Sequence, residues 1–216
     1  MYFDFFKLEN GDVFVAIGDV SGHGISAALI MLEARALFKA FSVENNTVGS
    51  ILDKMNFFLQ QDLEAERFMT FFLGCFSSDG EKFQYSSAGH EGPIWFKPGQ
   101  DKVETLDSTG TVLGFMEDIS FPSSEFYEVS KGDIFLFFTD GLFESTDSKG
   151  EQLGKNKLIE WIKSYRASSA EQLAVMSDNK ISIDYPVFAG VTIHNLFEFF
   201  MVFVILCGVA GAILLA

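Results

Sequence analysis

The sequence has few cysteines and few cations, and each shortage excludes a class of protein. Cys75 and Cys207 lie in apolar runs without a CxxC spacing, so we interpret both as reduced thiols and expect the catalytic part to be cytoplasmic. Lys and Arg number 15 against 30 Asp and Glu, for a formal net charge of −15. This excludes a nucleic-acid partner, because phosphate backbones are bound by clustered cations. Met1 opens directly into an aromatic, acidic stretch, so no signal peptide is expected.

Apolar residues are plentiful and phenylalanine is over-used. The 216 residues are 48% hydrophobic and include 26 Phe, enough for one domain with an interior crowded by aromatic strands. No internal repeat or low-complexity linker interrupts the chain. The composition therefore predicts one domain of ordinary size.

The pattern divides the chain into three parts. Residues 1–178 alternate strand-like and helix-like segments, and residues 179–195 form a divergent connector. The run from Phe199 to Ala216 has no charged residue, and a spanning helix needs about 20 apolar residues. We therefore predict a transmembrane helix over residues 196–216 that attaches the chain to a membrane. A buried core helix is the alternative.

Apolar runs bounded by turn residues predict the remaining elements. The predicted strands are Asp12–Asp19, Met69–Phe76, Lys82–Ser87, Ile94–Phe96, Val103–Leu106, Phe126–Val129 and Asp133–Thr139. The predicted helices are Ala27–Phe41, Thr47–Leu63 and Asn156–Tyr165.

Two corners that join Asp to Gly follow fully apolar strands. The first is Gly18-Asp19, which continues into Ser-Gly-His-Gly, and the second is Asp140-Gly141. A strand that ends in Asp presents a carboxylate on a rigid support, and two such carboxylates side by side repel unless a divalent cation joins them. Mg²⁺ and Mn²⁺ prefer oxygen ligands of this kind. Asp-Gly is also an ordinary turn dipeptide, so an ordinary turn remains the alternative for either corner alone.

Three segments, AIGDVSGHGISAAL, SSAGHEGP and FFTDGLFES, occur in that order. Together they resemble the SpoIIE/RsbU branch of the PPM-type (type 2C) serine/threonine phosphatases. The resemblance implies an α+β fold, an α-β-β-α sandwich of two central antiparallel sheets flanked by helices. It also implies a binuclear Mn²⁺ or Mg²⁺ centre and hydrolysis of phosphoserine or phosphothreonine on a partner protein. In bacteria such partners include STAS-type anti-anti-sigma factors.

The resemblance assigns roles to residues of both corners. Asp19 matches the aspartate that bridges both metals, and the backbone carbonyl of Val20 matches an additional oxygen ligand. Asp140 matches the ligand from the second central strand. Asp19 and Asp140 are therefore the expected catalytic residues.

Other residues are expected at the edge of this site, namely Gly18, Gly22, His23, His90, Gly141 and Glu144. His90 is either a water or phosphate contact or a histidine that stabilises its turn through backbone hydrogen bonds. His23 has the same two interpretations and is not expected to be a catalyst. Glu144 either accepts a hydrogen bond behind the site or is a surface residue.

The sequence departs from the family pattern in two places. Met1 stands where the family's Gly-Gly-Asp opening has its metal-binding aspartate, and Asp4 matches a later aspartate of that opening. The final Asp-Asp ligand has no clear match, which also predicts an unpaired sheet edge. We therefore expect weak metal binding and negligible hydrolysis of p-nitrophenyl phosphate by this chain as given.

Three interpretations follow from these departures. The chain is a phosphatase whose gene has a late start codon and a disrupted 3′ end, or a membrane-tethered module that binds a phosphoprotein without turnover. The third is a small membrane protein whose phosphatase-like part is a relic.

Overall fold

The computed structural model describes residues 2–44, 46–63, 67–130, 132–139, 155–156, 159–160, 163 and 202–206. These residues belong to two compact units. The first unit contains the described residues of Met1–Gly92 and Asp107–Val129, and the second contains those of Pro93–Leu106 and Ser130–Ala212.

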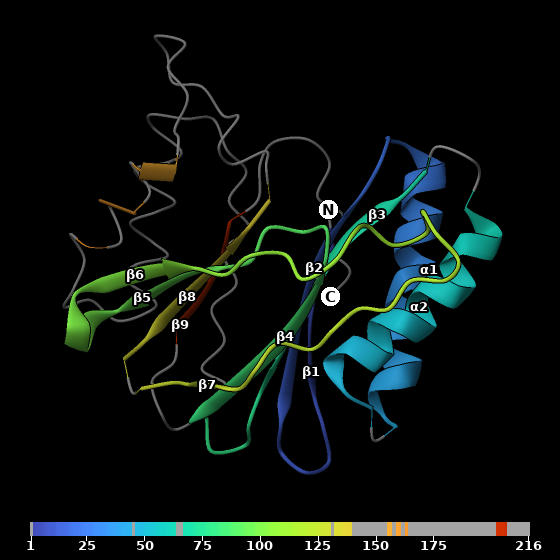
Figure 1. Cartoon of the computed structure of the whole chain (residues 1–216). Coiled ribbons are helices and arrows are strands. Elements are labelled where there is room, and N and C mark those ends of the chain that lie inside the picture. The colour runs from blue at the N-terminus through green and yellow to red at the C-terminus, as the bar shows by residue number, and fades with distance from the viewer. Residues whose placement is uncertain are drawn as a thin grey trace, which may run out of the picture. The chain divides into compact units, whose positions relative to one another are not determined.

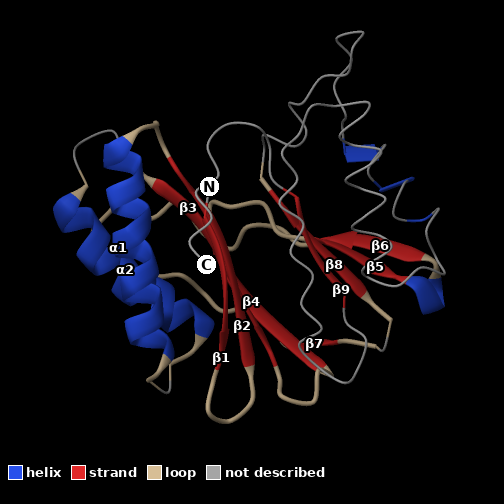
Figure 2. Cartoon of the chain, turned by 180° about the vertical axis from the view of Figure 1, so that it is seen from behind, coloured by secondary structure: helices blue, strands red, loops and turns tan. Residues whose placement is uncertain are grey.

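The first unit is built on a five-stranded sheet whose pairings are all antiparallel. Its strands, in spatial order, are β1 (Tyr2–Lys7), β2 (Val13–Val20), β3 (Met69–Phe76), β4 (Lys82–Ala88) and β7 (Tyr127–Glu128). Helices α1 (Ile25–Ser42) and α2 (Val48–Asp62) cover one face of this sheet (Figures 1 and 2). This is an arrangement of α+β type, as predicted.

Aromatic side chains fill the space between the helices and the sheet. Phe38 of α1 is fully buried, and its ring centroid lies 6.2–6.4 Å from those of Phe6, Phe14 and Phe71 on three successive strands. Complete burial of one such side chain contributes about 1.5–3 kcal/mol. These phenylalanine side chains therefore help to hold α1 against the sheet.

Strand β2 is buried on both of its faces. Phe14 and Ala16 belong to the core under the helices, while Val13, Val15 and Ile17, on the opposite face, are also buried. A strand buried on both faces is a continuous apolar run and does not alternate between apolar and polar residues. This explains why its sequence lacks the two-residue period.

The second unit contains a four-stranded sheet (Figure 2). Its strands, in spatial order, are β6 (Lys102–Thr105), β5 (Ile94–Lys97), β8 (Ile134–Phe138) and β9 (Val202–Leu206), with a short 3-10 turn, η1 (Pro98–Gln100), between β5 and β6. The indole of Trp95 stacks on Phe135 at 4.8 Å and donates a hydrogen bond to Asp133 Oδ2 at 3.0 Å. Burial raises the pKa of the Asp133 carboxyl.

The described residues of the predicted C-terminal helix form a strand instead. Among residues 196–216 the structure describes only Val202–Leu206, and these form β9, which pairs in parallel with β8. The segment VFVIL is rich in β-branched and aromatic residues, which favour strands, and an apolar run alone does not distinguish a strand from a helix. No helix in the described part of the chain has the length and apolar character needed to cross a membrane.

The same strand corrects a further expectation. Strand β9 pairs in parallel with β8, which departs from the two antiparallel sheets that the resemblance implies. The predicted strands are confirmed to within one or two residues. Both N-terminal predicted helices correspond to α1 and α2, and the described residues 155–156, 159–160 and 163 of the third are helical.

Candidate functional site

Asp19 lies at the end of β2, where the buried strand reaches the surface. It is exposed, whereas the other seven residues of β2 are buried. Its Oδ1 accepts a hydrogen bond from the backbone N–H of Val20 at 3.0 Å, which orients the carboxylate against its own strand. The sequence prediction that a carboxylate projects from a rigid strand end agrees with this geometry.

Gly18 allows β3 to approach β2 closely beside Asp19. A Cβ atom at Gly18 would lie 2.6 Å from the carbonyl oxygen of Thr70 and 2.8 Å from Cδ2 of Phe71. Real Cβ contacts are not so short, so a side chain at this position would push the strands apart. Gly18 is therefore required by packing, one residue before the candidate ligand.

The turn after β2 is fixed to the start of β3. The N–H of Ser21 donates to the carbonyl of Phe68 at 2.9 Å, and the N–H of Phe68 donates to Ser21 Oγ at 3.0 Å. Gly22 follows with a φ of +89°, a conformation in which a side chain is strained. His23 is exposed in this turn, and α1 begins directly after it without a side-chain cap or an acidic residue in its first turn.

His90 is linked to the strand end through Thr70. The side chain of His90 is buried, and its Nδ1 lies 2.9 Å from Oγ1 of Thr70. Thr70 Oγ1 in turn donates to the carbonyl oxygen of Asp19 at 3.4 Å. The backbone carbonyl of His90 accepts a hydrogen bond from Ser87 Oγ at 2.6 Å. His90 is thus close to the strand end that carries Asp19, and its ring contacts a side chain of β3.

The second predicted corner cannot be placed beside the first. Asp140, Gly141 and Glu144 lie outside the described residues, which in this region end at Thr139. Strand β8, predicted to lead into Asp140, is present over Ile134–Phe138. The role of Asp140 therefore stays a prediction.

The donor atoms at the first corner fit a hard divalent cation. Asp19 offers carboxylate oxygens at the surface and Val20 a backbone carbonyl oxygen, and oxygen ligands of this kind suit Mg²⁺ or Mn²⁺. Among the described residues, no three His, Cys, Asp or Glu side chains gather closely enough to hold a metal ion. A complete site would need ligands beyond this set.

Asp4 has a different role from Asp19. Its Oδ2 lies 3.2 Å from Arg35 Nε and 3.2 Å from Lys39 Nζ, both on α1, and accepts a hydrogen bond from Tyr2 at 3.2 Å. Burial, followed by the neighbouring Asp4 carboxylate, raises the pKa of the Tyr2 phenol. Asp4 therefore joins β1 to α1, a contact that the sequence analysis did not predict.

Thr70 is the main residue of this site that the sequence analysis missed. It faces Asp19 directly in the β2–β3 register, but it is separated from Asp19 in sequence by two helices. One feature of the sequence could have identified it: Thr70 is a polar residue at the second position of a predicted apolar strand, where a polar residue is unusual. The pairing partner of that strand could not be known from sequence alone.

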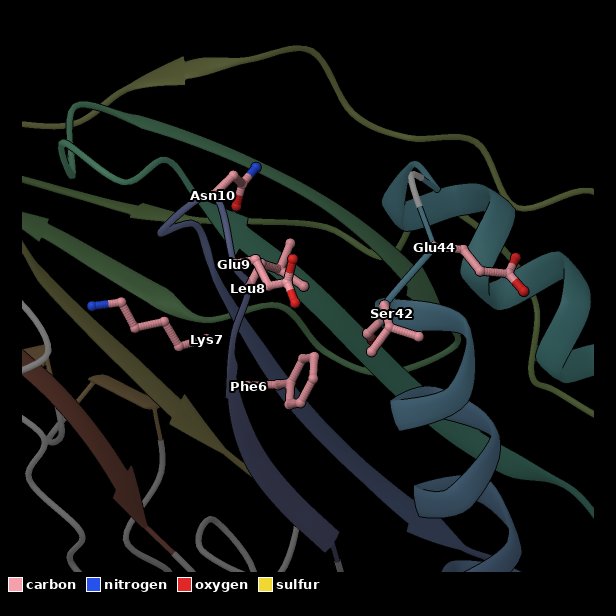
Figure 3. Close-up of a pocket in the computed structure, with 8 residues that line it drawn as sticks. Phe6, Lys7, Leu8, Glu9, Asn10, Ser42 and Glu44 are labelled. Carbon is pink, nitrogen blue, oxygen red and sulfur yellow. The ribbon is translucent and has the colours of Figure 1, made fainter.

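A depression elsewhere in the first unit lies far from this corner. It has a volume of about 370 Å³ and is lined by the β1–β2 turn and the end of α1, with Phe6, Asn10, Ser42 and Glu44 on its walls (Figure 3). Because Tyr2 pairs with Gly18 while the turn joins the other ends of β1 and β2, the depression is at the opposite end of the hairpin from Asp19. It is therefore separate from the candidate site.

Comparison with known proteins decides the family. The Stage II sporulation protein E (SpoIIE) family matches residues 9–179, which is most of the chain. The chain belongs to the SpoIIE family. Asp19, the turn that follows it and His90 all lie inside the matched region. The resemblance to the SpoIIE/RsbU branch of PPM-type phosphatases is thereby confirmed.

Individual relatives of this SpoIIE-family chain agree with the assignment. The phosphoserine phosphatase RsbU of Bacillus subtilis is 29% identical over 174 residues, which cover 80% of this chain and 50% of RsbU. The chain thus spans half the length of this relative.

Solved structures show that the fold is of the PP2C type. The RsbU and RsbW domains of Rv1364c from Mycobacterium tuberculosis match with a TM-score of 0.68 and 24% identity, over 81% of this chain and 51% of that one. RsbX, solved in complex with magnesium, matches with a TM-score of 0.57 and 18% identity, over 81% of this chain and 77% of RsbX.

Proposed function

We propose that this SpoIIE-family chain is a metal-dependent phosphatase that removes phosphate from phosphoserine or phosphothreonine of a regulatory partner protein. The observation that carries the proposal is the exposed Asp19 carboxylate at the end of buried β2, within the region that matches the SpoIIE family. That the relative RsbU is named a phosphoserine phosphatase supports the same reaction.

The proposed cofactor is Mn²⁺ or Mg²⁺. Asp19 and the carbonyl of Val20 would hold it, together with Asp140 as the proposed third ligand. When bound, such ions supply an activated water molecule and offset the negative charge of the phosphoryl group. RsbX has been solved with magnesium, which supports this choice of cation.

The exposure of the residues around Asp19 supports a protein as the substrate. Asp19 and the Gly22-His23-Gly24 turn are exposed, and the first turn of α1 has no acidic residue that would repel a phosphate. The proposed partner is a phosphorylated protein of the STAS anti-anti-sigma type.

A second candidate function is binding of a phosphoprotein without turnover. The observation in its favour is that Asp4, which by resemblance matches an aspartate of the family's opening segment, is held by Arg35 and Lys39. Asp4 is therefore engaged in joining β1 to α1, and charge count limits the affinity for hard cations. With fewer carboxylates, the chain could recognise phosphate without activating water.

Phosphate release from a phosphoserine-containing STAS protein distinguishes the two candidates. The full chain would be assayed over a range of Mn²⁺ concentrations, so that weak binding is overcome by mass action. We expect Mn²⁺-dependent release that falls at least about 100-fold in Asp19→Asn, since residues that bind the reacting groups contribute several kcal/mol to catalysis.

Asp101→Asn is the matched control. Asp101 is exposed and has a φ of +53°, a conformation that Asn tolerates, so its activity should equal that of the wild type. Release that is unchanged in Asp19→Asn would contradict the proposal. No release at any Mn²⁺ concentration, combined with preferential binding of the phosphorylated protein, would establish the second candidate.

A further inference from the structure

A chain of hydrogen bonds connects the buried His90 to the backbone of Asp19. His90 Nδ1 lies 2.9 Å from Thr70 Oγ1, and Thr70 Oγ1 lies 3.4 Å from the carbonyl oxygen of Asp19. Thr70 and Asp19 face each other across β2 and β3. The three residues therefore form one continuous path from the interior to the strand end.

Both hydrogen bonds of this path can exist at the same time in only one arrangement of the protons. A carbonyl oxygen can only accept, so the single hydroxyl proton of Thr70 is directed at Asp19. The lone pairs of Thr70 Oγ1 then face His90, and Nδ1 must carry a proton to complete the second bond. The complete path therefore requires a proton on Nδ1 of His90, because the partner of one ring nitrogen sets the tautomer.

The histidine end of the path is held by backbone contacts of its own. The carbonyl of His90 accepts from Ser87 Oγ at 2.6 Å, and this contact is buried. The preceding N–H, of Gly89, donates to the carbonyl of Gly110 at 3.0 Å. Strand β4 and the segment around Gly110 thus hold His90 in place, so that its ring can fix the position of the Thr70 hydroxyl.

The Asp19 end of the path acts on one peptide plane. The carbonyl of Asp19 and the N–H of Val20 belong to the same planar peptide unit. Thr70 holds the oxygen side of that plane, while the nitrogen side donates to Asp19 Oδ1 at 3.0 Å. Rotation of the plane would therefore move the proton donor that orients the carboxylate.

We propose that Thr70 and His90 are positioning residues that fix the Asp19–Val20 peptide plane and so aim the Asp19 carboxylate and the Val20 carbonyl at the metal. This inference rests on the proposed function for its metal. The hydrogen-bonded path does not depend on the reaction, and it adds two residues to the site that are not among the candidate metal ligands.

Two measurements on the full chain test the proposal. The first is the tautomer of His90 in the metal-free wild-type chain, read from the ¹⁵N chemical shifts of its assigned ring nitrogens, with a proton expected on Nδ1. The second is Mn²⁺ affinity by isothermal titration calorimetry. Thr70→Val keeps the shape of the side chain without its hydroxyl and should weaken binding about tenfold, as loss of a residue that orients a ligand does.

Thr70→Ser is the matched control because it restores the hydroxyl, and its Mn²⁺ affinity should stay within about twofold of the wild type. A structural role alone would lower the melting temperature of Thr70→Val without changing metal affinity. Equal Mn²⁺ affinity in the Val and Ser variants, or a proton on Nε2 of His90, would overturn the proposal. A wild-type chain that binds no Mn²⁺ would contradict the proposed function instead, and the tautomer, which needs no variant, would still decide the positioning role.

Discussion

At the scale of single residues, the position of Asp19 depends on its immediate neighbours. Gly18 lets β3 approach, and the Val20 N–H orients the carboxylate. Thr70 holds the carbonyl of the same peptide unit. A small change in the separation of β2 and β3 at this point would therefore change both the free energy of unfolding and the orientation of the Asp19 carboxylate.

Gly18→Ala tests this close approach. Because the new Cβ would lie 2.6 Å from the Thr70 carbonyl oxygen, the strands must separate, and we expect a loss of about 1–3 kcal/mol in the free energy of unfolding. Urea denaturation of the full chain measures it. The control is Gly99→Ala in η1, where nothing lies within 4 Å of the added Cβ, and the change should be within about 0.5 kcal/mol. Equal midpoints for the two variants would show that the strands do not restrict Gly18.

At the scale of elements, the sequence predicts most strands and helices but not their pairing. Strands β2 and β3 were predictable because each is an apolar run bounded by turn residues. Helix α2 was predictable from its apolar period, and it is capped by Thr47, whose Oγ1 accepts a hydrogen bond from the N–H of Ser50 at 3.2 Å. Strand β9 was mistaken for a helix because an apolar run is compatible with either a helix or a strand. Here the pairing with β8 makes it a strand.

The candidate site was predictable to the same extent. Asp19 was identified because its own strand and turn mark it locally. Thr70 was missed because its place opposite Asp19 is set by the β2–β3 register, a contact between residues far apart in sequence. Asp140 remains a prediction. Local pattern thus identifies a ligand, whereas the residues that support it depend on tertiary structure.

Between helices α1 and α2, the carboxyl groups of Glu33 and Asp62 interact. Burial, followed by the neighbouring Asp62 carboxylate, raises the pKa of Glu33 above its ordinary value of 4.5. The folded state then binds the Glu33 proton more tightly than the unfolded chain does. Stability should therefore fall as pH rises from about 4.5 through the raised folded pKa.

Glu33→Gln removes this penalty and should raise the free energy of unfolding at pH 7 by about 0.5 kcal/mol, the scale of one partly exposed charge pair. At about pH 3.5 the gain should largely vanish, because Glu33 is then protonated in both the folded and the unfolded chain. Asp62→Asn should have a similar effect, and the double variant should gain no more than either single one. A loss of stability at pH 7, or a gain that does not depend on pH, would contradict this account of the helix pair.

At the scale of the whole molecule, the chain is a SpoIIE-family protein with a large excess of acidic residues. It matches the SpoIIE family over residues 9–179 and carries a formal net charge of −15. A chain this acidic attracts divalent cations without a specific site. Binding of Mn²⁺ is therefore informative only when it depends on a particular carboxylate.

Mn²⁺ binding to the full chain, measured by electron paramagnetic resonance of the free ion at physiological ionic strength, is the most direct test of Asp19 as a metal ligand. Wild type and Asp101→Asn should share one class of sites that is tighter than the weak background. Asp19→Asn should weaken that class at least about tenfold, since charge count sets the affinity of oxygen sites. Identical binding curves for Asp19→Asn and the wild type would contradict the account.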